Sequence, residues 1–271
     1  MIIGKQIMII AWFSCGATSA VACKIALTMY ADVRIVYIET GSGHPDNNRF
    51  LRDCERWYGQ RIEVIRSAVY ENVEDVIIRR KYINGPYGAP CTLCLKKQVR
   101  YNFEDQVKMW DGQIWGFDFC KREVNRAIRF KQQNTHTKPL FPLIEKMITK
   151  QDALRMLQMA GIEIPAMYRM GYANNNCIGC VKGGIGYWNK IRKDFPEQFQ
   201  RMAEIERQVG STCLKDKNGR IWLDELDPTH GNDVIPIVPD CSLFCAIEFE
   251  NIEDTQTVKV MNGEISIHET H

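Results

Sequence analysis

The first third of the chain alternates short apolar segments with segments whose apolar residues recur at helical spacing. Apolar and β-branched residues fill 7–12, 33–38 and 62–65, which predicts three buried strands. Between them, 20–27 and 45–58 have the residue spacing of helices. Because parallel strands need a crossover that is usually a helix, this order predicts an α/β fold: a doubly wound, mostly parallel, Rossmann-like sheet with helices on both faces.

After residue 65 the sequence predicts more helices than strands. We expect an α/β domain over 1–145 and a helical, cysteine-rich region over 146–271 that packs on it, or one continuous domain. The sequence also predicts helices over about 71–82, 93–109, 149–160 and 197–209, a strand over 113–117 that leads to Asp118, and a hairpin around Asn262 and Gly263.

A short hydroxyl-rich turn joins the first strand to the first helix. Its small and hydroxyl residues are Ser14, Gly16, Thr18 and Ser19. The first N–H groups of a helix have no partner within it, and with the helix dipole they attract anions, so the turn predicts a phosphate site. The alternative is an ordinary tight turn with Ser14 or Thr18 as N-cap. The turn has neither the Walker pattern nor Gly-x-Gly-x-x-Gly.

The second strand also ends in residues suited to a ligand. It runs into Glu39, Thr40 and Gly41. In doubly wound sheets, ligands bind beyond the carboxyl ends of the strands, so this segment and the hydroxyl-rich turn are expected at the same edge.

Composition narrows the class of protein. The 271 residues carry a formal net charge of +2, which argues against a general nucleic-acid coat or a membrane-surface protein. The sequence contains neither a long apolar run nor a signal-peptide pattern, so we expect a cytoplasmic protein. In that compartment its 11 cysteines are expected to be reduced thiols, metal ligands or catalytic groups.

Six cysteines form three close pairs. Two Cys-x-x-Cys units, Cys91 with Cys94 and Cys177 with Cys180, can together complete a four-thiolate site for zinc or an iron–sulfur cluster. The wider pair Cys241 and Cys245 competes for the same places. Two alternatives remain: small buried residues without a ligand, or a dithiol that cycles with a disulfide.

One basic segment raises the question of nucleic-acid binding. Residues 182–193 combine lysines and arginines with Tyr187 and Trp188, which could follow a backbone and stack on bases. The alternative is a solvated helix start whose two aromatic rings pack on the core.

The ordered series of motifs resembles the phosphoadenosine phosphosulfate (PAPS) reductase family of the PP-loop, adenine nucleotide alpha-hydrolase-like superfamily. The likeness extends over about residues 7–195 and is closest to proteins common in phages and mobile elements. Its landmarks are Phe13-Ser14-x-Gly16-x-x-Ser19, Glu39-Thr40-Gly41, Cys91-Thr92-x-x-Leu95-Lys96, Gly116 with Glu123 and Arg126, Pro142-Leu143-Ile144, and Tyr168-x-x-Gly171-Tyr172 before Cys177-x-x-Cys180.

The resemblance implies an adenine nucleotide, PAPS, adenosine phosphosulfate (APS) or ATP, as ligand, with Mg²⁺ as a further candidate. It assigns the hydroxyl-rich turn to the phosphate or sulfate end and Glu39, Thr40 and Gly41 to the side of the nucleotide. A thiol reductant such as thioredoxin, a nucleic-acid substrate and a homodimer are the partners it suggests. The implied anion-binding positions are Lys96, Gly116, Arg126 and Arg129.

Two departures from the family pattern bear on the reaction. Cys15 stands for a glycine, and Thr18 for the aspartate that would help Mg²⁺ in ATP-cleaving relatives. The late catalytic cysteine expected in Glu-Cys-Gly-x-His is absent, and Cys241 or Cys245 is the candidate replacement. We therefore expect sulfonucleotide reduction or a related sulfur transfer. The alternatives are ATP-dependent adenylyl transfer or thiolation of a nucleic acid, and a non-catalytic nucleotide-binding subunit.

Overall fold

The structure is a computed structural model of the chain. It describes residues 7–85, 88–217 and 219–231, together with the strands 256–261 and 264–269.

The centre of the molecule is a five-stranded parallel sheet in the order β3-β2-β1-β4-β5. This confirms the predicted α/β class, with β1, β2 and β3 at the three predicted strands. Crossover connections place the strand ends at a common edge. The strands are β1 (Met8–Phe13), β2 (Asp32–Glu39), β3 (Glu63–Arg66), β4 (Gly112–Ile114) and β5 (Pro139–Leu140).

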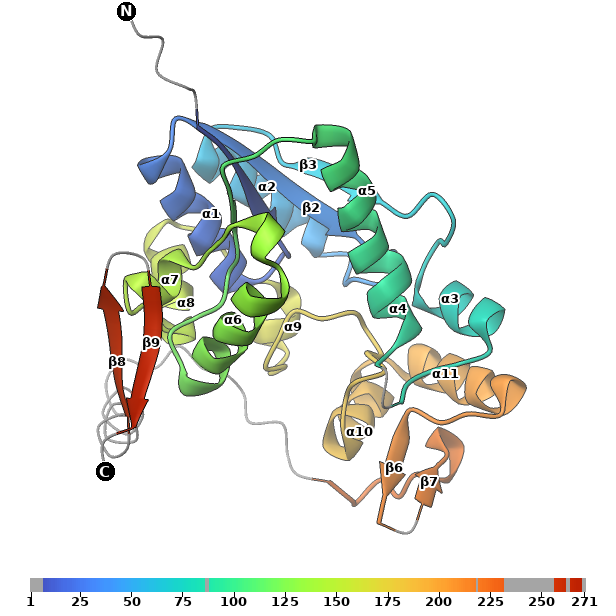
Figure 1. The fold of residues 1–271 in the computed structure, drawn as a ribbon. Coiled ribbons are helices and arrows are strands. Elements are labelled where there is room, and N and C mark those ends of the chain that lie inside the picture. Colours follow the sequence, from blue (N-terminus) through green and yellow to red (C-terminus); the bar gives the residue numbers. More distant parts are fainter. Residues whose placement is uncertain (1–6, 86–87, 218, 232–255, 262–263, 270–271) are drawn as a thin grey trace, which may run out of the picture.

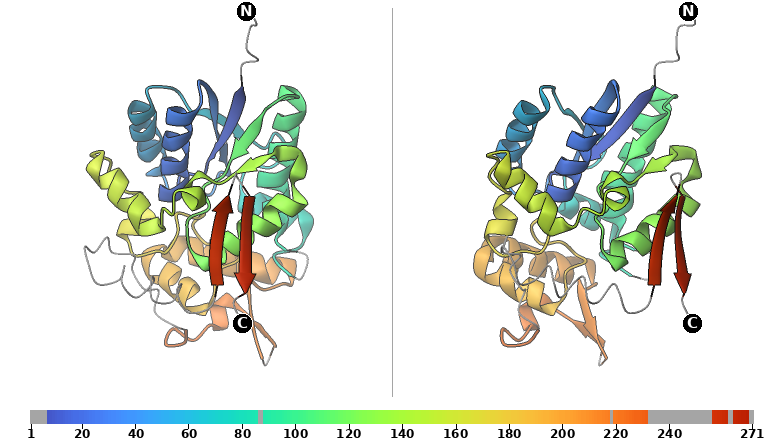
Figure 2. Two further views of the ribbon diagram at one scale, coloured as in Figure 1. Left: turned by 60° about the vertical axis from the view of Figure 1, so that its left-hand side comes forward. Right: turned by 90° about the vertical axis from the view of Figure 1, so that its left-hand side faces the viewer.

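Helices cover both faces of the sheet (Figures 1 and 2). The side chains of β1 alternate between two cores: Ile9, Ala11 and Phe13 pack on the face covered by α1, whereas Ile10 and Trp12 pack on the face covered by α5. The covering helices are α1 (Ala17–Met29), α2 (Asn47–Tyr58), α7 (Pro142–Glu145) and α8 (Lys150–Met159) on the first face and α5 (Gln98–Val107) and α6 (Lys121–Gln133) on the other.

One long helical segment contains the first cysteine motif, Cys91 with Cys94, and leads to β4. It comprises α4 (Pro90–Thr92), a π-helical turn (Leu93–Lys97) and α5. The predicted helix over 93–109 is therefore present with a different start. A π turn contains more residues than a turn of α-helix, so it changes the direction in which the side chains of Cys94, Lys96 and the following residues point.

A second apolar core lies beside the sheet. It is built around Trp188, Ile191 and Met202, with contributions from Val76 and Met167. Its elements are α3 (Val73–Arg80), α9 (Ala166–Arg169), α10 (Ile185–Asp194), α11 (Pro196–Val209), β6 (Leu214–Asp216), β7 (Gly219–Ile221) and a 3₁₀ turn (Leu223–Glu225).

The remaining elements are partly as expected. β8 (Gln256–Met261) and β9 (Glu264–Glu269) pair antiparallel, which confirms the predicted hairpin; its turn, 262–263, lies outside the described residues. Helix α6, the 3₁₀ turn Thr135–Thr137 and β5 were not predicted. Within the described part of the chain, every helix is too short or too polar to cross a membrane.

Candidate functional site

The hydroxyl-rich turn between β1 and α1 is held by its own hydrogen bonds. The Ser19 hydroxyl accepts from the backbone N–H and the hydroxyl of Ser14, at 3.0 Å each, and donates to the carbonyl oxygen of Gly16 at 2.9 Å. Ser19 is therefore committed to shaping the loop. Ser14 is exposed and faces the cavity described below.

Cys15 takes a backbone conformation that glycine usually supplies, with φ of 59°. This is the position at which the family pattern has glycine. Its side chain is buried, and burial is the largest cause that raises its pKa. Cys15 is thus a packed, protonated thiol that shapes the loop.

Gly116 lies against the start of α1. A Cβ on Gly116 would come within 2.6 Å of the Cα and 2.7 Å of the N atom of Ser19. From the other side, the hydroxyl of Tyr168 accepts a hydrogen bond from the N–H of Ala17 at 3.4 Å. The start of the helix is thus fixed on both sides.

The end of β2 forms the neighbouring wall. Gly41 has a φ of +68°, and its N–H donates to the Glu39 carboxylate at 2.8 Å. That carboxylate also accepts from the Tyr37 hydroxyl at 3.1 Å. Glu39 therefore shapes this turn through polar contacts within it.

The second cysteine motif is attached to this strand end. The N–H of Ile178 donates to the carbonyl of Ser42 at 2.9 Å, and the Sγ of Cys177 lies 3.3 Å from the hydroxyl oxygen of Thr40. Residues far apart in sequence thus place a thiol beside the sheet edge.

These segments enclose a cavity of about 300 Å³. Among the described residues, basic side chains line it, no acidic side chain does, and the rings of five aromatic residues form much of the wall. The predicted residues among the lining are Ser14, Thr40, Lys96 and Arg126, with Cys177 at one end; the others are Trp12, Phe13, Tyr37, Ile38, Gly43, Asn47, Thr92, Lys97, Arg100, Trp115, Phe130, Asn175 and Asn176.

Arg100 is a pocket residue that the sequence analysis missed. It is only 6% exposed, its Nε lies 3.5 Å from the buried Glu104 carboxylate, and its guanidinium lies 5.4 Å from the Trp115 ring. Glu104 also accepts from Gln113 at 2.9 Å, and Gln113 in turn accepts from the Trp12 indole at 2.8 Å. One sequence feature could have indicated Arg100: it lies one helical turn after Lys96, and residues four positions apart share a face of a helix.

Arg126 borders the cavity from α6. Its guanidinium lies 4.7 Å from the Phe117 ring and 3.1 Å from the Glu123 carboxylate, and its side chain is 62% exposed. Arg129 is exposed on the same helix and is not among the lining residues.

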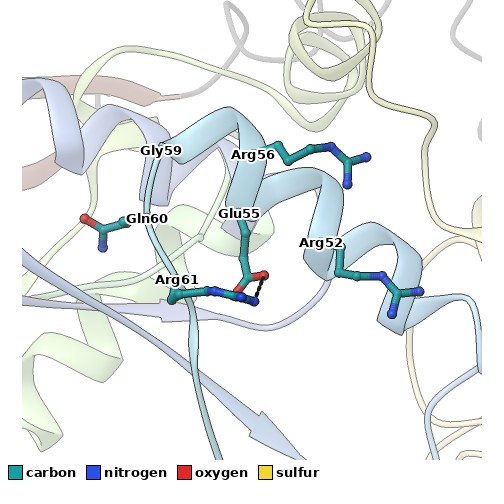
Figure 3. A pocket seen from close by; sticks show the side chains of 6 residues that line it. All are labelled: Arg52, Glu55, Arg56, Gly59, Gln60 and Arg61. Carbon is teal, nitrogen blue, oxygen red and sulfur yellow. Dashed lines mark hydrogen bonds and ion pairs between the residues drawn. The ribbon is translucent and has the colours of Figure 1, made fainter.

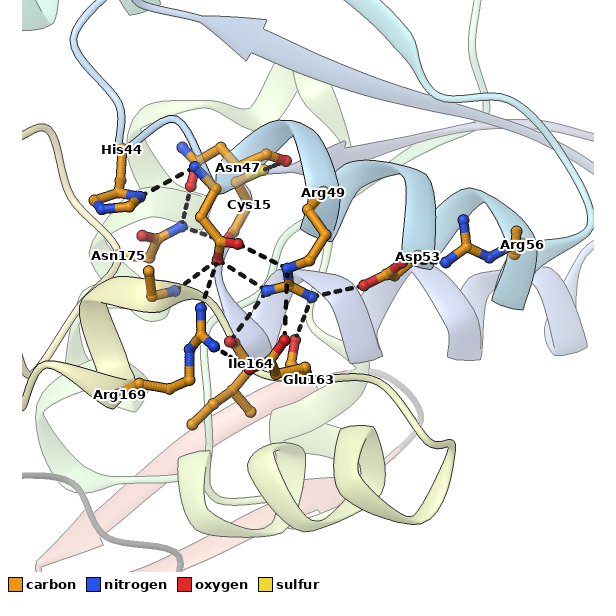
Figure 4. A network of polar contacts seen from close by, with 12 residues as sticks. Cys15, His44, Asn47, Arg49, Asp53, Arg56, Glu163, Ile164, Arg169 and Asn175 are labelled. Atoms are coloured by element: carbon orange, nitrogen blue, oxygen red, sulfur yellow. Dashed lines mark hydrogen bonds and ion pairs between the residues drawn. The ribbon is translucent and has the colours of Figure 1, made fainter.

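A polar network ties the hydroxyl-rich turn to its surroundings (Figure 4). The Asn175 amide donates to the carbonyl of Cys15 at 2.7 Å and to the side chain of Asn47 at 2.8 Å. Next to it, Arg49 donates to both carboxylate oxygens of Asp46, at 2.7 and 2.8 Å. This hydrogen bonding is the main reason why the pKa of Asp46 falls to about 2.

Asp118 lies beyond the end of β4, as predicted. It is 9% exposed, and its Oδ1 lacks a hydrogen-bond partner within the described structure. Burial raises the pKa of Asp118 above its usual value, with the Lys150 ammonium acting in the opposite direction. Asp118 is not among the residues that line the cavity.

Cys91 and Cys94, two of the predicted metal-binding cysteines, have different surroundings. Burial first, and then the charges of Cys177 and Cys180, raise the pKa of Cys91. Cys94 is buried and lines a different cavity, of about 510 Å³, with Arg80. Among the described residues, no three ligand atoms of His, Cys, Asp or Glu stand at metal-binding geometry. Cys241 and Cys245 lie outside the described residues.

The aromatic residues of the basic segment 182–193 point inward. Trp188 is fully buried, and the Tyr187 hydroxyl donates to the carbonyl of Cys177 at 3.1 Å. This agrees with the alternative in which the two rings pack on the core, and Trp188 is not available to stack on bases.

A separate basic hollow lies at the far end of α2 (Figure 3). It has a volume of about 430 Å³, and the Arg61 guanidinium lies 3.2 Å from Glu55 there. Because α2 ends just before β3 begins, the hollow is at the amino-terminal edge of the sheet, opposite the candidate site.

The fold is a parallel sheet with a hydroxyl-rich strand-to-helix turn and a cation-lined cavity at its carboxyl edge. This is the edge at which doubly wound α/β proteins bind their ligands. Residues 8–183 match the family model of the phosphoadenosine phosphosulfate reductase domain, and the chain belongs to this family. The resemblance stated from the motifs is confirmed.

Individual relatives are distant. An uncharacterized protein of Methanocaldococcus jannaschii is 24% identical over 238 residues, which are 82% of this chain and 45% of the relative, so the chain spans about half of that protein's length. The PAPS reductase of Candida auris in its phosphate complex aligns with a TM-score of 0.45 and 9% identity over 62% of this chain and 80% of that one. The U34-tRNA thiolase NcsA of Methanococcus maripaludis, with its [4Fe-4S] cluster, aligns with a TM-score of 0.38 and 13% identity over 76% and 72%.

Proposed function

We propose that this chain is an enzyme that binds an adenine sulfonucleotide in the cavity between Ser14, Lys96 and Cys177 and reduces it or transfers its sulfur. One observation carries the proposal: of the residues that the structure describes, four basic side chains and no acidic one line the cavity at the carboxyl edge of the sheet. An anionic ligand is the chemistry that such a wall attracts.

The cavity wall has a cationic part and an aromatic part, and these suggest how the nucleotide is oriented. The negative end of the nucleotide lies at Ser14 and the start of α1, whose first turn contains no acidic residue. Lys96 and Arg126 supply further positive charge, and Thr40 and Gly41 border the nucleotide from β2. The purine stacks among the aromatic residues, of which Trp12 and Trp115 present the largest rings.

Within the described part of the chain no acidic residue lines the cavity, and this favours a sulfonucleotide over Mg²⁺-bound ATP. Mg²⁺ is usually held by one or two carboxylates together with the phosphates, and Thr18 stands where ATP-cleaving relatives have aspartate. The phosphosulfate of PAPS or APS needs only hydrogen-bond donors and cations. ATP-dependent thiolation of a nucleic acid is the second candidate, and it would release pyrophosphate in place of sulfite.

The proposed reduction needs a thiolate and a dithiol partner. The thiolate attacks the sulfur of the nucleotide, an S–S bond forms, and the S–O bond to the phosphate breaks, which releases the nucleotide. A thiol of a thioredoxin-like partner then attacks the cysteine sulfur, and sulfite leaves as the disulfide forms. Cys241 and Cys245 are the candidate nucleophiles, as late thiols in the chain.

The cysteine loop fits a thiolate-bound metal centre. The backbone N–H of Lys182 donates to the Cys180 sulfur, which lowers the pKa of that thiol against the larger effect of burial. Such N–H···S bonds are the support that metal-bound thiolates need. Cys91, Cys177 and Cys180 would hold the group, with Cys94 as the fourth predicted ligand. A bound cluster or zinc ion would cross-link these cysteines and so fix the loop of Cys177 at the edge of the cavity that Cys177 lines.

Product analysis tests the proposal. The full chain is incubated anaerobically with PAPS, APS or ATP and with a thioredoxin-type dithiol, and sulfite and pyrophosphate are measured. We expect sulfite from PAPS or APS, lost in Lys96→Met and retained in Lys193→Met, a lysine on α10 that is exposed away from the cavity. Pyrophosphate from ATP alone would favour thiolation. Nucleotide binding without either product would favour the non-catalytic subunit.

A further inference from the structure

A second cavity lies on the other side of the helical segment that carries Lys96. It is the cavity of about 510 Å³ that Cys94 lines, and we call it the β3–α5 groove. Residues 65–70, at and after the end of β3, form one wall, and α5 forms the other (Figure 1). Along this segment Lys96 and Arg100 line the candidate site, whereas Gln98 and Asn102 line the groove. One helical segment thus separates two cavities.

The groove opens beside an edge strand. β3 has four residues and pairs with β2 alone among the described strands. An edge strand presents N–H and C=O groups that have no partner strand on its free side. Its last two residues, Ile65 and Arg66, line the groove. A short extended peptide can add to such an edge as a further strand through main-chain hydrogen bonds.

A row of carboxamides faces the groove from α5. Gln98, Asn102 and Gln106 follow one another at intervals of four residues, and all three are exposed and line the groove. Four residues advance a helix by about 6 Å, and two residues of an extended peptide span about 6.6–6.8 Å. Carboxamides both donate and accept hydrogen bonds, as peptide groups do. The row therefore suits the backbone of an extended peptide.

The charge of the groove is positive. Arg66 and Arg80 line it, and no acidic side chain of the described residues does. Within the same part of the chain, neither guanidinium has a carboxylate partner at ion-pair distance. Glu63, the acidic residue of β3, is already paired with Arg34 at 2.7 Å. The two arginines are thus available to carboxylates of a ligand.

The remaining side chains favour a peptide over a nucleic acid. Single-stranded nucleic acids stack their bases on open aromatic rings. The Tyr70 ring has the Arg79 guanidinium 4.5 Å from its centre, and Phe103 is only 5% exposed. By contrast, Val69 is 61% exposed and Leu93 51% exposed, and both line the groove. These two residues offer contacts to apolar side chains.

We propose that the β3–α5 groove binds an extended acidic segment of a partner protein. The segment adds to the free edge of β3 and lies along the carboxamide row of α5. Its carboxylates pair with Arg66 and Arg80, and its apolar side chains contact Val69 and Leu93. This inference goes beyond the proposed nucleotide chemistry and does not depend on it, because the two cavities share no lining residue.

Peptide binding by charge variants tests the proposal. Labelled peptides of alternating valine and glutamate, or of alternating valine and lysine, are titrated with the full chain, and fluorescence anisotropy is measured. We expect the glutamate peptide to bind at least about tenfold more tightly. Arg66→Glu and Arg80→Glu should each weaken its binding about three- to tenfold, since each replaces an exposed ion pair by like charges. Lys193→Glu is the matched control, because Lys193 is exposed and lines neither cavity.

The contacts of the peptide backbone are tested separately. Asn102→Ala removes the middle carboxamide and should weaken binding about two- to tenfold. Alternate N–H groups of an added strand face the strand that it joins. Of two peptides N-methylated at all valines or at all glutamates, only one should therefore keep its affinity. In the unmutated chain, the amide resonances of Val64, Ile65 and Arg66 should shift when the unmethylated peptide is added.

Several results would overturn the proposal. They are no binding of the glutamate peptide, equal binding of the lysine peptide, wild-type affinity in both arginine variants, and equal affinity of the two N-methylated peptides. A polythymidine oligonucleotide that shifts the same amide resonances and displaces the peptide would assign the groove to nucleic acid. A dimer that is lost in Arg66→Glu would assign it to a second copy of the chain.

Discussion

The hydroxyl oxygen of Thr40 and the sulfur of Cys177 lie 3.3 Å apart, although 137 positions separate them in sequence. Thr40 directly follows β2, and Cys177 begins the loop that leads to the second core. This contact, with the Ile178–Ser42 backbone bond, places a thiol at the edge of a cation-lined cavity. The contact between this edge of the sheet and the loop of Cys177 is the basis of our functional account.

Removing the Thr40 hydroxyl should loosen the cysteine loop. We expect Thr40→Val to lower the free energy of unfolding by about 1 kcal/mol, because the Cys177 thiol loses its polar partner. Amide exchange at Ile178 should accelerate. Thr40→Ser keeps the hydroxyl and should behave as wild type in urea unfolding and hydrogen exchange. Equal exchange rates in all three proteins would contradict the role of this contact.

A methyl group at Gly116 should displace the start of α1. The Cβ would stand 2.6 Å from the Ser19 Cα, so Gly116→Ala should cost about 1–3 kcal/mol in urea unfolding and weaken nucleotide binding further. Gly184→Ala is the matched control, because a Cβ there meets nothing within 4 Å. If nucleotide affinity were unchanged in Gly116→Ala, the packing of Gly116 on the phosphate loop would not matter for binding.

Replacing only one member of the buried ion pair Arg100–Glu104 should lower the free energy of unfolding strongly. Arg100→Met leaves a carboxylate that is only 5% exposed without its guanidinium, and we expect a loss of about 3–5 kcal/mol in urea unfolding. Arg100→Met with Glu104→Gln removes the charge as well, and the amide still accepts from Gln113. Most of the stability should return in this double variant. Additive losses would show that the two side chains act independently.

Asp46 should make stability depend on acidic pH. Its pKa is about 2 in the folded protein, mainly because Arg49 donates hydrogen bonds to it, and about 3.9 in an unfolded chain. A depressed folded pKa stabilises the fold above pH of about 4, and this contribution is lost as pH falls toward 2. The difference in unfolding free energy between wild type and Asp46→Asn should therefore shrink between about pH 4 and 2. A difference that stays constant over this range would contradict the assignment.

The sheet was predictable because its strands are continuous apolar runs separated by helical patterns. β4 and β5 were harder, since they have three and two residues and leave little periodic signal. Helix α6 was missed because its polar residues dominate, and only Val124 and Ala127 mark its buried side.

Site residues that belong to short sequence motifs could be predicted. Site residues whose role depends on tertiary packing could not. Ser14, Thr40, Lys96 and Arg126, which belong to four separate motifs, all line one cavity. Arg100 was missed because its role comes from burial beside Glu104, which no local pattern records. The spacing of Cys91 and Cys94 suggested a pair, but the π turn and Arg80 direct Cys94 to another cavity.

The central claim is that the cavity at the carboxyl edge binds an adenine sulfonucleotide. Isothermal titration of the wild-type chain with PAPS, APS and ATP, repeated on Lys96→Met and on the control Lys193→Met, tests it most directly. The account predicts that PAPS or APS binds without added Mg²⁺, that Lys96→Met loses about 1–3 kcal/mol of binding free energy, and that Lys193→Met loses none. Equal affinities in all three proteins, or no binding of any of the nucleotides, would contradict it.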